Sequence, residues 1–119
     1  MSLLFQEEKI GNITLKNRIV MPPMCMYKSD NSGELKAFHK THYLARAVGG
    51  VGLIIVEATA VEPKGRISDA DLGLWEDSQI IQHKELNEDI HFLEQKQLFK
   101  LPMQVENLLL KIQLLLLQV

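Results

Sequence analysis

Residues 51–56, Val-Gly-Leu-Ile-Ile-Val, leave few folds open to this chain. The run is apolar, rich in β-branched side chains and directly preceded by Gly49-Gly50. A continuous apolar run of this length is typical of a strand covered on both faces, as in a parallel sheet flanked by helices. The sequence therefore predicts an α/β fold.

The segments before this run complete a strand, helix, strand unit. Residues 19–21, Ile-Val-Met, predict a buried strand that ends at Pro22-Pro23, because proline offers no N–H to a neighbouring strand. Residues 38–48 have helical spacing, and Gly49-Gly50 are expected to end the helix in a left-handed cap. The predicted buried face of this helix consists of Phe38, His42, Ala45 and either Leu44 or Val48.

Shorter patterns extend this unit in both directions. Residues 5–18 predict a hairpin around Gly11-Asn12, and residues 28–36 predict a polar loop. After a loop over residues 62–72, an amphipathic helix is expected from about residue 79 to 93, with Asp77 or Ser78 as its cap. Strand followed by helix thus occurs twice, which predicts two βα units with right-handed connections.

Composition excludes several classes of function. The chain has 13 basic and 15 acidic side chains without a long basic run, which argues against nucleic acid as a partner. No apolar stretch approaches the roughly 20 residues that span a bilayer, so no membrane association is expected. The first residues lack the pattern of a signal peptide, and the single cysteine, Cys25, forms no internal disulfide. A cytoplasmic protein is expected.

Three motifs could indicate a dinucleotide site, a metal site or a nucleophile, but each also has a purely structural explanation. Gly49, Gly50 and Gly52 precede the strand, whereas a dinucleotide fingerprint needs its glycines after the strand. His39 and His42 have no further ligand at suitable spacing, so no metal site is expected. Cys25, taken alone, is either a small buried hydrophobe or a nucleophile.

A longer pattern places Cys25 in a specific context. Residues 17–27 read Asn-Arg-Ile-Val-Met-Pro-Pro-Met-Cys-Met-Tyr. Together with four later segments, this pattern resembles the Old Yellow Enzyme family of FMN-dependent NAD(P)H oxidoreductases, in the bacterial branch with a cysteine beside the flavin. The resemblance covers residues 5 to 93, and the later segments are residues 38–43, 52–61, 65–68 and 71–75.

The resemblance implies part of a TIM (β/α)8 barrel. A complete barrel takes about 250 residues, more than twice the 119 present, so only the first two βα units are expected. Family members hold FMN at the carboxyl ends of the strands. By resemblance, Tyr27 faces the substrate, and the residues that contact FMN are Pro22, Pro23, Met24 and Cys25 from the first strand and Ala58 from the second. Pro22 stands where many relatives have Ser or Ala, which removes a backbone donor.

The resemblance also implies a reaction. Hydride passes from NAD(P)H to FMN and then to the β-carbon of an activated alkene such as an enone, and full-length relatives are expected to be homo-oligomers. No segment here matches the later strand that holds the substrate oxygen or the loop that binds the FMN phosphate. We therefore assign no catalytic residue, and we expect this chain to be an inactive amino-terminal fragment.

Residues 94–119 do not follow the family pattern. The family motif Gln-aliphatic-Ala-His-Ala-Gly-Arg-Lys is expected soon after Leu93, but residues 99–108 differ from it. If each codon is started at the third base of the preceding codon, the bases that encode residues 99–108 can encode this whole motif. This match predicts that residues 94–119 are an out-of-frame tail. The alternative is a genuine Leu-rich helix, which would make the chain a short βα interaction module that dimerises through its carboxyl-terminal helix.

Overall fold

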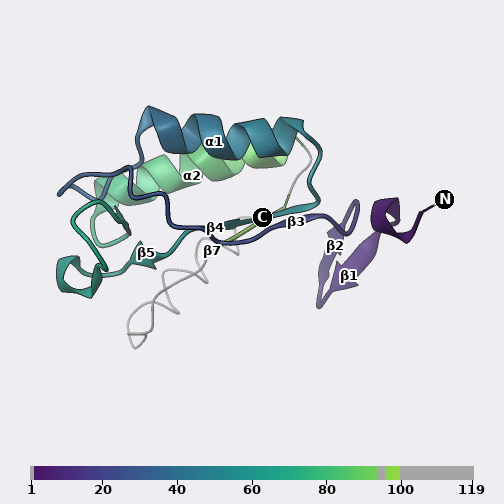
Figure 1. Cartoon of the computed structure of the whole chain (residues 1–119), viewed down its shortest axis with the longest axis horizontal. Helices are drawn as coiled ribbons and strands as arrows, with labels where there is room; N and C mark the ends of the chain where they lie inside the picture. The colour runs from purple at the N-terminus through teal and green to yellow at the C-terminus, as the bar shows by residue number, and fades with distance from the viewer. Residues whose placement is uncertain (1, 94–95, 100–119) are drawn as a thin grey trace.

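The computed structural model describes residues 2–93 and 96–99 and shows an α/β arrangement (Figure 1). A parallel sheet has the order β3 (Val20–Met21), β4 (Leu53–Val56) and β7 (Lys96–Phe99), with β4 in the centre. Helices α1 (Ala37–Val48) and α2 (Asp77–Phe92) lie side by side over one face of this sheet. The predicted α/β fold with parallel strands is therefore confirmed, and no closed barrel is formed by the described residues.

The third parallel strand goes beyond the two βα units expected from the sequence. β7 pairs with β4 in the register Leu53↔Lys96 to Val56↔Phe99, and it lies inside the predicted tail 94–119. Such pairing uses backbone groups, so the open edge of β4 accepts a segment with little regard to its side chains. The rest of the tail, including the predicted Leu-rich helix, lies outside the described residues.

The buried face of α1 differs from the predicted one. His39, Tyr43 and Ala47 are almost fully buried, whereas Phe38 is 48% exposed and Val48 74% exposed. The prediction followed hydrophobicity and was wrong for Phe38, Ala45 and Val48, which are exposed, whereas Leu44 is partly buried against the core. Hydrogen bonds of His39 Nδ1 and of the Tyr43 hydroxyl lower the cost of burying these polar atoms, while His39 Nε2 has no hydrogen-bond partner among the described residues. Phe38 lies outside, where its ring stacks on the His42 ring at 5.8 Å between centroids.

The helix ends are set by specific backbone and side-chain contacts. Gly50, directly after the cap residue of α1, has φ +94°, which confirms the predicted left-handed conformation. The cap of α2 is Glu76, so the prediction of Asp77 or Ser78 was wrong by one or two residues. The Oε1 atom of Gln79 accepts hydrogen bonds from the N–H groups of Trp75 and Glu76, and so the first turn begins earlier than the hydrophobic pattern suggested.

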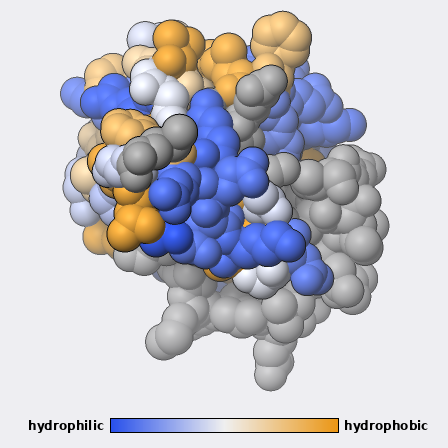
Figure 2. All heavy atoms as spheres, turned by 90° about the vertical axis from the view of Figure 1, so that its right-hand side faces the viewer, coloured by the Kyte–Doolittle hydropathy of each residue, from blue (hydrophilic) through white to orange (hydrophobic). Residues whose placement is uncertain are grey.

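A hairpin occupies the end of the sheet where the strands begin. β1 (Glu8–Ile10) and β2 (Ile13–Leu15) are antiparallel, with Gly11 at φ +57° in the turn, as predicted. A short 3-10 helix, η1 (Leu3–Phe5), precedes them, and Leu4 accepts a hydrogen bond from the N–H of Arg18. Figure 2 shows that hydrophilic side chains occupy the centre of this end of the molecule.

Asn17 joins the start of β3 to the turn before β4. Its side chain donates to the carbonyl of Gly50 at 2.7 Å and accepts from the N–H of Ile19 at 3.0 Å. Gly52 lies so close that a Cβ placed on it would stand 2.5 Å from the Asn17 carbonyl oxygen. This contact fixes β3 and β4 relative to each other and requires glycine at position 52.

The opposite end of the sheet carries the longer connections. There β5 (Thr59–Ala60) and β6 (Leu72–Gly73) form a separate parallel pair, joined through the 3-10 helix η2 (Pro63–Gly65). Beneath these connections lies one hydrophobic core, whose buried members are Met21, Leu35, Tyr43, Ala47, Ile54, Val56, Leu72, Leu86 and Ile90. Neither of the helices in the described ranges is long and apolar enough to cross a membrane.

Candidate functional site

The residues that follow β3 and β4 lie at one edge of the sheet, because the two strands are parallel. This edge collects the predicted site residues from two segments far apart in the sequence. The N–H of Met26 donates to Oε2 of Glu57 at 3.1 Å and joins the two segments directly. The side chains of Pro22, Met24 and Tyr27 are exposed, and those of Pro23, Cys25 and Ala58 are half-buried.

Cys25 and Tyr27 lie two residues apart in the segment after β3, and the backbone changes direction at Tyr27. Tyr27 has φ +53°, a left-handed conformation that is uncommon for a residue other than glycine. The pKa of Tyr27 is raised, first by the charge of Cys25 and then by partial desolvation and by Asp71. A thiol and a phenol thus lie near each other at the strand ends, and the carboxyl groups of Asp71 and Glu57 also raise the pKa of the phenol.

Glu57 is a buried carboxyl group that the sequence analysis missed. It follows β4 directly and is 1% exposed. Its Oε1 accepts from the Tyr43 hydroxyl at 3.0 Å, and the same hydroxyl accepts from the Glu57 N–H at 3.0 Å. Burial raises the pKa of Glu57, and the hydrogen bonds from Met26 and Tyr43 act against this rise.

His39 completes this buried group. Its Nδ1 accepts a hydrogen bond from the N–H of Lys36 at 3.1 Å, so the proton of the neutral ring lies on Nε2. Nε2 faces Oε1 of Glu57 at 3.8 Å, which is longer than a hydrogen bond. Burial lowers the pKa of His39, so the ring is neutral beside Glu57 at neutral pH.

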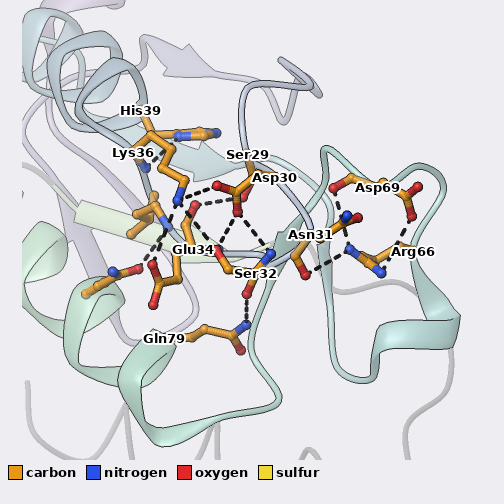
Figure 3. Close-up of polar contacts among 12 residues, drawn as sticks. Ser29, Asp30, Asn31, Ser32, Glu34, Lys36, His39, Arg66, Asp69 and Gln79 are labelled. Atoms are coloured by element: carbon orange, nitrogen blue, oxygen red, sulfur yellow. Dashed lines mark hydrogen bonds and ion pairs between the residues drawn. The ribbon is translucent and has the colours of Figure 1, made fainter.

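The loop that links β3 to α1 is fixed by its own polar side chains (Figure 3). The Nζ of Lys36 lies 2.8 Å from Oδ2 of Asp30, and this contact, followed by those from Ser32, holds the pKa of Asp30 well below its ordinary value. Gln79 donates from Nε2 to the Ser32 carbonyl at 2.7 Å and ties the loop to the start of α2. The polar loop predicted over residues 28–36 is therefore ordered by specific contacts.

The second connection, between β5 and β6, is held in a similar way. The Oδ2 atom of Asp71 accepts from the N–H groups of Ile67 and Ser68 at 2.7 and 3.3 Å. The guanidinium of Arg66 lies 5.4 Å from the centre of the Trp75 ring and also reaches the Asn31 carbonyl (Figure 3). These contacts bring both connections to the same side of the site.

The carboxyl edge of the two strands presents mostly apolar side chains. It offers methionine, proline and alanine side chains, one half-buried thiol, one exposed phenol, and a buried carboxyl that accepts from the Met26 N–H. Among the described residues, no group of three or more His, Cys, Asp or Glu could hold a metal ion, and His39 is buried while His42 stacks on Phe38. One signal could have identified Glu57: an acidic residue at the end of an otherwise apolar strand.

Several known proteins resemble this chain in sequence. The sequence profile of the NADH:flavin oxidoreductase / NADH oxidase family matches residues 3–109. The chain is 55% identical over 93 residues to an NADPH dehydrogenase of Listeria monocytogenes, which covers 77% of this chain and 28% of that protein. It is 62% identical over 72 residues to an NADPH dehydrogenase of Clostridium acetobutylicum, covering 60% of this chain and 21% of that protein.

Solved structures resemble the described part of the chain over a similar fraction. An Old Yellow Enzyme from Pichia sp. AKU4542 superimposes with a TM-score of 0.78 at 28% identity, over 83% of this chain and 26% of that one. Morphinone reductase gives a TM-score of 0.75 at 28% identity, over 82% and 25% of the two chains. The chain therefore spans about a quarter of the length of the proteins it resembles.

Proposed function

Since the chain belongs to the NADH:flavin oxidoreductase / NADH oxidase family, we propose that residues 1–93 are the amino-terminal, FMN-binding part of an NADPH dehydrogenase of the ene-reductase type. The observation that carries this proposal is the pair of segments 22–27 and 57–59 at the carboxyl edge of two parallel strands, where a barrel of this kind builds its site. The identity of 55% to an NADPH dehydrogenase over 93 residues supports NADPH as the reductant.

The residues at this edge fit one face of a flavin ring. Pro22 and Met24 expose apolar side chains beside the half-buried Cys25 and Ala58. These four, with Pro23, would contact FMN, which when bound supplies the hydride-transfer chemistry of the family. The Cys25 sulfur would adjust the electron affinity of the ring, because it is polarisable and sits at a fixed place in the segment.

Tyr27 is proposed to contact the substrate. Its side chain is 49% exposed and lies near Cys25, so one short segment would contact both the cofactor and the substrate. A phenol hydroxyl donates a hydrogen bond to the carbonyl of an activated alkene such as an enone and holds the alkene in place. This hydroxyl is protonated at neutral pH already at the ordinary tyrosine pKa of about 10, and the raised pKa of Tyr27 does not change that.

We further propose that the 119-residue chain is inactive by itself. It spans about a quarter of its relatives, and none of its segments corresponds to the phosphate-binding part of a barrel, which lies after the seventh and eighth strands. Residues 94–119 are proposed to be an out-of-frame tail, although the family profile match extends to residue 109.

A chimera tests the proposed function without relying on the tail. Residues 1–93 of this chain replace the corresponding amino-terminal segment of the Listeria monocytogenes NADPH dehydrogenase, and the unmodified dehydrogenase serves as the control. The chimera is expected to purify with FMN bound and to reduce an enone such as 2-cyclohexenone with NADPH. A chimera that folds cooperatively but binds no FMN would contradict the proposal.

A further inference from the structure

Glu57 is the group whose presence the proposed chemistry does not yet explain. Both of its carboxyl oxygens are used, Oε1 by the Tyr43 hydroxyl and Oε2 by the Met26 N–H. The charged or titratable groups around it are His39 and Tyr43 from α1, Asp71 from the connection before β6, and Cys25 and Tyr27 from the segment after β3. None of these supplies a positive charge at neutral pH.

A buried carboxyl without a cation costs stability because its charged form is desolvated, and such groups cluster at functional sites. An apolar side chain of similar size in this place would avoid the desolvation, but it would leave the Met26 N–H and the Tyr43 hydroxyl without their acceptor. The contacts of Glu57 therefore indicate what the group does: it holds α1 and the segment after β3 to the end of β4.

The segment after β3 depends on this contact. Residues 22–28 form neither helix nor strand. Met26 supplies the one backbone N–H between Pro23 and Ser29 for which the described residues provide an acceptor, and the next fixed point is the N–H of Ser29 on the Ala70 carbonyl. Cys25 and Tyr27 are the two chain neighbours of Met26, so the hydrogen bond from Met26 to Glu57 restrains the positions of both.

Tyr27 gives a second, independent observation. A tyrosine at φ +53° is strained, and such a conformation persists only where neighbouring contacts determine it. The neighbouring contact on the amino side is the Met26 hydrogen bond to Glu57. The strained residue is also the one proposed to contact the substrate.

We propose that Glu57 is a positioning residue, which clamps the Met26 backbone and thereby presents the Cys25 sulfur and the Tyr27 hydroxyl in fixed directions at the site. The value of these directions to catalysis rests on the proposed function. The clamp itself is a property of the chain without cofactor, so it can be tested separately from the binding of FMN.

The test uses the 119-residue chain and three variants. Glu57→Ala removes both acceptors. Glu57→Gln keeps one carbonyl oxygen to accept from the Met26 N–H, and its side-chain NH2 group would donate to the Tyr43 hydroxyl oxygen. Thr59→Val is the matched control, because Thr59 is equally buried and loses a hydrogen bond to the Glu57 carbonyl without touching Met26.

The first measurement follows the Met26 amide proton by NMR from about pH 4 to about pH 8. In the unchanged chain its shift is expected to titrate with a midpoint above the ordinary glutamate value of about 4.3. Thr59→Val should keep this titration and Glu57→Gln should abolish it. A Met26 amide that does not titrate, or that titrates equally in Glu57→Gln, would overturn the proposal.

The second measurement is the alkylation rate of Cys25 by iodoacetamide, read by mass spectrometry on dilute protein, with the urea-unfolded chain as the upper reference. Loss of one hydrogen bond to a charged acceptor predicts a rate about ten-fold higher in Glu57→Ala than in the unchanged chain. Glu57→Gln and Thr59→Val are expected to stay within about two-fold of the unchanged chain. Equal rates in Glu57→Ala and Thr59→Val would show that Glu57 has only a general structural role.

Discussion

Replacing Tyr43 by Phe is a sharp test of the buried group around Glu57. The substitution keeps the ring, which is 1% exposed, and removes only the hydroxyl. Two hydrogen bonds of 3.0 Å are lost together, one from the Glu57 N–H and one to its Oε1. A buried N–H left without an acceptor costs about 1–3 kcal/mol, and a lost hydrogen bond to a charged group costs about 1.5–3 kcal/mol.

The two losses share one atom and are not additive, so we expect a decrease of about 3 kcal/mol in the free energy of unfolding. With a urea m value of about 1.5 kcal/mol per M, the midpoint falls by about 2 M. Tyr27→Phe is the matched control and should change stability by less than about 0.5 kcal/mol, because the Tyr27 side chain is exposed. Equal midpoints for the two variants would refute the reasoning.

Four further outcomes are expected. Burial raises the pKa of Glu57 in the folded chain, so protonated Glu57 contributes to stability below its ordinary pKa of about 4.3, and this contribution is lost as pH rises through its higher pKa in the folded chain. The urea midpoint should therefore fall over this pH range in the unchanged chain but not in Glu57→Gln. Gly52→Ala should destabilise the chain by about 2 kcal/mol or more in the same assay, since its Cβ would meet the Asn17 carbonyl. In the chimera, Cys25→Ala should shift the flavin potential in redox titration, whereas Tyr27→Phe should lower enone turnover and leave the potential in place. The isolated chain should bind FMN weakly in a fluorescence titration, and stoichiometric yellow protein would contradict this.

The βαβ unit could be predicted because its signals are local. Two prolines end β3, a glycine pair ends α1, and a continuous apolar run forms β4. Each of these residues acts through backbone geometry or through burial on both faces, which a single sequence displays directly.

The buried polar group could not be predicted in the same way. The burial of Tyr43 is compensated by a hydrogen bond to Glu57, which is 14 residues beyond Tyr43 in the sequence, and the burial of His39 is partly compensated by a hydrogen bond from the Lys36 N–H to its Nδ1. Hydrophobic periodicity measures the transfer of side chains from water and contains no information about such partners. The same limit explains why Phe38 was expected inside and Glu57 was overlooked.

The positions of the flavin-contacting residues stand as predictions from resemblance. The structure places Pro22 to Tyr27 beside Glu57 and Ala58 through one hydrogen bond, which the order of the strands already favoured. The left-handed backbone at Tyr27 was not foreseeable, because an isolated tyrosine strongly disfavours it.

The pairing of β7 with β4 has a consequence for how such a gene can change. Four residues of the predicted tail satisfy the edge of β4 along its whole length, from Leu53 to Val56. Because this pairing uses backbone N–H and C=O groups, many different amino-acid sequences can form it. A shift of reading frame after Leu93 would thus remove the catalytic residues encoded downstream. It would still leave a peptide that pairs with β4, so the local sheet could form without enzyme activity.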